Sequence, residues 1–296
     1  IRFAAHDNTI SCVGQGYHRY EKRQDKIVPW RHFFTISYDG CLALWDIPVE
    51  NSKPKCEGRV RVSNSELVCA VYDAIKFTYI VGDNNGCVSI WSVDELKPVR
   101  TLQHVIRAAP SVPSSFARHS AVVISTHRRP AHKEAVTSVA LDGNMIVSAG
   151  EDKAVFMWNS ITGECVKELA TVTSHYHELS SAKGLELDDN GGEGEPRFGE
   201  IQQVCVHPNT GDIFACTRSG IIMSFNQATG EASAYYKVAA EVSAMCLNPL
   251  SNEVVIGLDN GNLQRTPASM FRSLTNHKVT VEEEEEKQER GNQNAE

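Results

Sequence analysis

The sequence lacks the motifs by which most enzymes and metalloproteins are recognised. Its 296 residues hold nine cysteines but no C-x-x-C pair, and no G-x-S-x-G occurs. The glycines at positions 14 and 16 have neither a third glycine nor a following lysine, so they do not match a phosphate-binding loop. Cys205 and His207 lie two residues apart, without the further ligands that a metal site needs. We therefore expect no enzymatic activity, no metal, no cofactor and no small-molecule substrate.

Long apolar runs and an export signal are also missing. No stretch of about 18 apolar residues occurs, so no membrane span is predicted. The chain opens with IRFAAHDNTI, which has no starting Met and no signal-peptide pattern, and we expect a processed or truncated chain. The cysteines are odd in number and several lie inside apolar runs, which favours free thiols in a reducing compartment. The sequence thus favours the cytoplasm and leaves the nucleus open.

The net charge of −8 hides an uneven distribution along the chain. Residues 178–200 and 282–296 each carry seven acidic and two basic residues, whereas residues 106–133 carry five basic residues and no acid. A long stripe of basic residues, as nucleic-acid-binding proteins often show, is absent. The glutamate run at the end predicts that residues 278–296 form a disordered acidic tail.

What the sequence has in quantity is short strands. In residues 135–159, the segment AVTSVAL alternates with period two, and the apolar segments MIVSAG and AVFMWN follow it, separated by the turn residues DGN and EDK. Comparable segments recur in residues 8–47, 66–93, 201–226 and 242–266. When the second turn of each copy is aligned, Trp45, Trp91, Trp158 and Phe225 share one position. Five copies with an underlying period of about 40 to 45 residues indicate a β-propeller.

At these positions the chain resembles the WD-repeat β-propeller family. The residues that carry the resemblance are His132, Ser148, Asp152 and Trp158 in the third copy. The first copy matches them with His6, Thr35, Asp39 and Trp45. The resemblance implies that each set of four side chains forms a buried hydrogen-bonded chain with a structural role. The other copies depart from the pattern, since Val81 and Ala215 replace the hydroxyl residue, and we expect those blades to depend on apolar packing alone.

The predicted fold is all-β, a propeller of four-stranded antiparallel blades. Residues 1–277 form the propeller, and upstream sequence is expected to complete a seven-bladed ring. The five copies lie near residues 1–50, 51–97, 98–164, 165–231 and 232–270. Insertions at 14–31, 106–131 and 172–200 lengthen connections between strands, and their composition predicts solvated loops.

Function is expected in these loops, because blades serve mainly as structure. The candidate partner-binding residues are basic: Arg118, Arg128, Arg129, Lys133, Arg19 and Arg23. Our hypothesis is a non-enzymatic scaffold or adaptor that binds other proteins within a multiprotein complex. Two alternatives stay open. The first is an RNA-associated propeller in ribosome assembly or RNA processing, because Tyr17 and Tyr20 lie among basic residues. The second is the regulatory propeller of a larger enzyme.

Overall fold

The computed structural model describes residues 4–23, 26–47, 53–107, 126–169, 200–230, 232–238 and 240–270. The chain divides into two compact units, residues 1–152 with 156–167, and residues 153–155 with 168–296. The acidic tail and residues 172–199 of the third insertion lie outside the described residues. The boundaries of the copies and the seven-bladed ring stay predictions.

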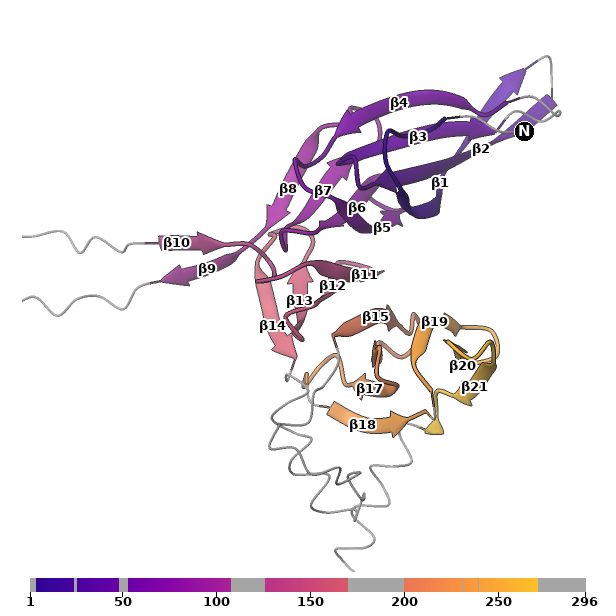
Figure 1. Cartoon of the computed structure of the whole chain (residues 1–296). Helices are drawn as coiled ribbons and strands as arrows, with labels where there is room; N and C mark the ends of the chain where they lie inside the picture. The colour runs from indigo at the N-terminus through magenta and orange to yellow at the C-terminus, as the bar shows by residue number, and fades with distance from the viewer. Residues whose placement is uncertain are drawn as a thin grey trace, which may run out of the picture. The chain divides into compact units, whose positions relative to one another are not determined.

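Antiparallel sheets follow one another along the chain, and in each sheet the strands are in sequence order (Figure 1). The first sheet comprises β1 (Ile10–Arg23), β2 (Lys26–Ser37), β3 (Cys41–Ile47) and β4 (Lys55–Arg61). The second comprises β5 (Leu67–Asp73), β6 (Thr78–Asp83), β7 (Val88–Ser92) and β8 (Pro98–Leu102). The third comprises β11 (Val136–Asp142), β12 (Met145–Gly150), β13 (Val155–Asn159) and β14 (Cys165–Leu169).

The second unit holds two further sheets. One comprises β15 (Ile201–Val206), β16 (Ile213–Thr217), β17 (Ile221–Phe225) and β18 (Ala232–Lys237), and the other comprises β19 (Val242–Asn248), β20 (Glu253–Leu258) and β21 (Leu263–Pro267). A separate two-stranded ribbon pairs β9 (His104–Arg107) with β10 (Thr126–Arg129). The all-β class and the four-stranded antiparallel blades are confirmed.

The turn used to align the copies has one backbone feature in all five sheets. Its final residue adopts a left-handed conformation, with φ between 64° and 92°, at Gly40, Gly86, Lys153, Gly220 and Gly261. Glycine adopts this conformation without steric cost, which explains the recurrent Asp-Gly and Asn-Gly pairs. At Gly40 the backbone also passes so close to the carbonyl oxygen of Ser63 that a side chain would collide with it.

Each first strand of a sheet carries a β-bulge near its start. One extra residue interrupts the pairing with the second strand, and these residues are Ser11, Val68, Thr137, Gln202 and Ser243. A bulge redirects the side chain that follows it. In the first two sheets that side chain is Cys12 or Cys69, whose thiols lie near the carbonyl oxygens of Ala70 and Val136 in the next first strand. The repeated bulge thus helps to link successive sheets.

The core lies between successive sheets. Phe34, Leu42, Leu67 and Tyr79, from the first two sheets, belong to one buried cluster. A second cluster joins the two sheets of the second unit, and its residues are Phe214, Cys216, Ile222, Val238, Val242, Met245, Val254, Ile256 and Ala268. In the second, third and fourth sheets the second strand, which is β6, β12 or β16, is buried along its whole length rather than at alternate residues.

Candidate functional site

The third sheet contains a chain of four polar side chains that are withdrawn from solvent. Nδ1 of His132 lies 2.9 Å from Oδ1 of Asp152, and Nε2 of His132 lies 2.8 Å from Oγ of Ser148. The indole Nε1 of Trp158 donates to the same Oγ at 2.8 Å. An indole N–H can only donate, so Oγ of Ser148 accepts from Trp158, and in the neutral tautomer with a proton on Nδ1 it donates to Nε2 of His132. Nδ1–H of the imidazole then donates to Asp152. Both ring nitrogens are therefore used in a structural contact.

The first sheet repeats the arrangement and adds two residues that the sequence did not indicate. Nε2 of His6 lies 2.7 Å from Oγ1 of Thr35, and Nδ1 of His6 lies 3.0 Å from Oδ2 of Asp39. Nε1 of Trp45 donates to Oγ1 of Thr35 at 2.8 Å. Nη2 of Arg59, on β4, lies 2.9 Å from Asp39 and 2.7 Å from Asp7. No motif signals Arg59, because only the pairing of β3 with β4 brings it to the turn.

The carboxylate of Asp39 stays ionised in acid. Burial alone would raise its pKa, but the backbone amides of Asp7 and Cys41 and the ring of His6 donate to it. These donors outweigh the burial and lower the pKa of Asp39 to about 2.

The second sheet corrects the expectation that a blade without the four-residue set depends on apolar packing alone. Nε1 of Trp91 donates to Oγ of Ser89 at 2.9 Å, although Val81 stands at the usual hydroxyl position. Asp83 accepts from Oγ of Ser63 at 2.8 Å and from the amide of Cys87 at 2.9 Å. The second sheet therefore also contains hydrogen bonds between side chains, but the acceptors, Ser89 and Asp83, stand at other positions than those of the four-residue set.

All nine cysteines are free thiols. Burial is the main cause that raises the pKa of Cys205 and of Cys216 to about 12. A thiol with such a pKa is protonated at neutral pH and is a poor nucleophile. These two residues thus behave as small apolar side chains of the core.

Four of the six candidate partner-binding residues lie on two strand pairs, and Lys133 lies in the loop before β11. Arg19 and Arg23 lie on β1, and Arg128 lies on β10. Arg129 and Lys133 are exposed, and Arg118 lies outside the described residues. The insertion at 14–31 was expected to lengthen a turn, whereas the structure continues β1 and β2 as a paired ribbon as far as Arg23 opposite Lys26. The insertion at 106–131 likewise includes the end of β9 and all of β10, which pair as a ribbon.

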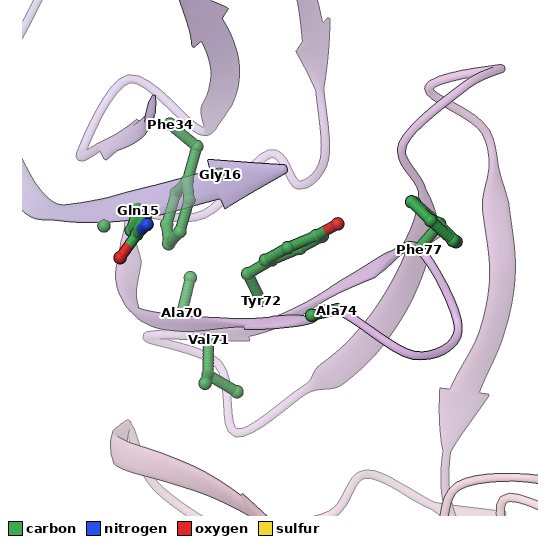
Figure 2. Close-up of a pocket in the computed structure, with 9 residues that line it drawn as sticks. Gln15, Gly16, Phe34, Ala70, Val71, Tyr72, Ala74 and Phe77 are labelled. Carbon is green, nitrogen blue, oxygen red and sulfur yellow. The ribbon is translucent and has the colours of Figure 1, made fainter. Parts of the chain in front are cut away.

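A cleft of about 560 Å³ opens where this first ribbon leaves the body of its sheet. It is lined by Gly14, Gln15, Gly16, Phe34, Ala70, Val71, Tyr72, Ala74 and Phe77, from β1, β2, β5 and the turn after β5 (Figure 2). A side chain at position 14 would collide with the ring of Phe34, so the glycine lets that ring lie against β1. The G-Q-G sequence therefore lines a mainly apolar cleft.

Among the residues that the structure describes, no group of three or more His, Cys, Asp or Glu side chains is placed to hold a metal ion. In that part of the chain no helix has both the length and the apolar character needed to cross a bilayer.

The family model described as "WD domain, G-beta repeat" matches residues 123–159. This segment contains His132, Ser148, Asp152 and Trp158, whose hydrogen bonds are described above. Residues 123–159 therefore match a WD repeat. Among curated proteins, the chain is 21% identical to CCR4-associated factor 4 of Saccharomyces cerevisiae, over 78% of this chain and 32% of that protein. It is 24% identical to Mitochondrial division protein 1 of Schizosaccharomyces pombe, over 62% of this chain and 28% of that protein.

A third relative is Protein FIZZY-RELATED 1 of Arabidopsis thaliana, which is 25% identical over 53% of this chain and 38% of that protein. The chain thus spans about a third of the length of the curated relatives that it matches. Among solved structures, a chain of "Crystal Structure of Mitotic Checkpoint Complex" matches with a TM-score of 0.56 and 13% identity, over 80% of this chain and 57% of that chain. At this identity the match shows the propeller fold alone.

Proposed function

We propose that this WD-repeat protein is a non-enzymatic scaffold, which holds other proteins together in a multiprotein complex through its faces and projecting ribbons. The observation that carries the proposal is that the recurrent histidines are buried and hydrogen-bonded within the blades. The side chains of His6 and His132 are 0% exposed, and both nitrogens of each ring contact neighbouring side chains. Groups held in this way brace the blades and are not available to a substrate.

The surface of the first unit supports the same proposal. The ribbon of β1 and β2 between residues 17 and 31 carries five basic and two acidic residues. The ribbon of β9 and β10 contains Arg107, Arg128 and Arg129 and no acid. Both ribbons combine a regular strand-paired backbone with a basic composition, which suits recognition of an acidic protein surface. We place the protein in the cytoplasm, with the nucleus as the alternative.

Affinity purification of the full chain tests the scaffold. A defined set of proteins should be retained after washing at both low and high salt, because scaffold interfaces combine apolar and polar contacts. The variant Arg128→Glu with Arg129→Glu should lose part of the set while keeping the wild-type melting temperature. Recovery of no reproducible partner would contradict the proposal.

An RNA-associated propeller is the second candidate, and the basic ribbon with Tyr17 and Tyr20 favours it. RNA binding would weaken steeply as salt is raised and would be abolished by the same double substitution. A protein set that is lost on nuclease treatment would support this second candidate instead of the scaffold.

A further inference from the structure

Three turns between the first and second strands of a sheet share one backbone design. The turns begin at Asp73, His207 and Asn248, and the residue four positions later is left-handed in each. That residue is Gly211 with φ 72° in one turn and Asn252 with φ 54° in another, which are the residue types that adopt this conformation most readily. In the turn after β5 it is Phe77, with φ 52°. A bulky residue in this conformation is a strained outlier.

Burial does not compensate for the strain at Phe77. Its side chain is 50% exposed, and that of Ile75, two residues earlier, is 79% exposed. Two large apolar side chains are therefore presented to solvent from one turn. Strained backbone that does not improve packing is typical of positions with a binding role.

The rest of the turn is held firmly. Oδ1 of Asp73 accepts from the amides of Ile75 and Lys76 at 2.9 and 3.0 Å. Nζ of Lys76 bonds Oδ2 of Asp73 at 2.9 Å and the carbonyl oxygen of Gly143 at 2.7 Å. The carbonyl oxygen of Phe77 accepts from the amide of Val93 at 3.0 Å. The exposed apolar pair is thus preorganised, which lowers the entropy lost when a partner binds.

The turn borders the cleft between β1 and β5, as Figure 2 shows. Tyr72 and Phe34 lie in the cleft, and both rings pack on the buried ring of Tyr79, at centroid distances of 5.3 and 4.9 Å. The cleft thus has aromatic rings on its inner wall. Its volume of about 560 Å³ is large enough for a bulky side chain and not merely for one water molecule.

The charge near the cleft indicates which partner fits. β1 runs directly from the lining residues Gly14–Gly16 into the basic ribbon of residues 17–31, in which five basic residues outnumber two acids. A peptide anchored in the cleft and continuing along this ribbon would meet a positive field. Acidic residues beside the apolar anchor complement that field.

We propose that the turn at residues 73–78 and the adjacent cleft form a docking site for a segment of a partner protein, with one bulky apolar side chain flanked by acidic residues. The apolar side chain enters between Phe77 and Tyr72, and the acidic flank follows the basic ribbon. This inference rests on the scaffold function and names one surface through which the scaffold acts.

The test selects a random-peptide phage library on the full wild-type chain, with counter-selection on Phe77→Asn. Asparagine keeps the left-handed backbone, as Asn252 does, and removes only the apolar surface. Synthetic peptides made from the selected sequences should share a large apolar residue and an excess of acids. Fluorescence polarisation should show at least about ten-fold weaker binding to Phe77→Asn. Leu250→Ser is the matched control, because Leu250 is an exposed apolar residue of the equivalent turn in the last sheet, where it is 98% exposed.

Several results would overturn this site. One is that no peptide survives the counter-selection, and another is that the surviving peptides have neither apolar nor acidic character. A third is that Leu250→Ser weakens peptide binding as much as Phe77→Asn does. Phe77-dependent self-association in light scattering would identify a second copy as the occupant, and Phe77-dependent binding of a single-stranded RNA would identify a nucleic acid. If affinity purification gives the same partner set from wild type and Phe77→Asn, the docking site fails while the scaffold function stands.

Discussion

Nε1 of Trp158 lies 2.8 Å from Oγ of Ser148, on the neighbouring strand of the third sheet. Through His132 this hydroxyl is joined to Asp152 in the turn, so a core indole and a turn carboxylate belong to one network. Removal of one member leaves buried partners without a hydrogen bond, which costs more than the net value of the bond itself.

Asp152→Ala removes the carboxylate that accepts from His132 and from the amide of Lys133. We expect a loss of about 1–3 kcal/mol in the free energy of unfolding. Urea unfolding followed by tryptophan fluorescence measures it. Glu134→Ala, which removes an exposed acid two residues from His132, should stay within about 0.5 kcal/mol. An equal effect of the two substitutions would contradict the role of the network.

Asp39 gives stability that depends on pH. Its pKa is about 2 in the folded chain, against an ordinary value of 3.8, so the unfolded chain takes up the proton first as pH falls. The contribution is complete above the ordinary value and is lost as pH falls toward about 2. The urea midpoint of wild type should exceed that of Asp39→Asn at neutral pH, and the gap should narrow below about pH 4. A constant gap down to pH 3 would show that other groups hold the turn.

Ser89→Ala tests the bracing of the second sheet. It leaves the largely buried Nε1–H of Trp91 without its acceptor, so we expect a loss of about 1–2 kcal/mol. The double mutant Ser89→Ala with Trp91→Phe should be less destabilised than the sum of the two single mutants, because the orphaned donor is removed with its acceptor. Strict additivity in the cycle would mean that the contact contributes nothing.

Phe77→Asn should hardly change stability. Relief of the left-handed strain, worth about 1–2 kcal/mol, offsets the loss of a half-exposed ring. Differential scanning calorimetry should therefore give a melting temperature within a few degrees of wild type. A large fall would make Phe77 a packing residue and would weaken the case for a docking role.

Truncation after Val281 should leave the melting temperature unchanged, because a run of glutamates has no apolar surface to bury. Calorimetry of the shortened and full chains makes the comparison. A decrease of several degrees would show that the tail contributes to the folded state.

Much of the fold could be predicted from local patterns. Period-two alternation and Asp-Gly or Asn-Gly turns identify strands and hairpins within a few residues, and their recurrence indicates blades. His132, Ser148, Asp152 and Trp158 could be found because their spacing within one copy is regular. Ser89 was missed, because an acceptor two residues from Trp91 on the same strand belongs to no repeated pattern.

The sequence by itself determined the strands, their order and the residue types that brace the first and third sheets, since these depend on contacts within one repeat. Only the tertiary structure decided the features that depend on strand register and on contacts between neighbouring sheets. The insertion after Gly14 became a strand pair, since the register of β1 and β2 continues beyond the body of the sheet. Arg59 reached Asp39 across a strand pair, and Phe77 came to line one cleft with Gly14–Gly16 of the preceding sheet. Contacts between residues far apart in the chain leave no periodic trace in the sequence, and for that reason the cleft could not be predicted from it.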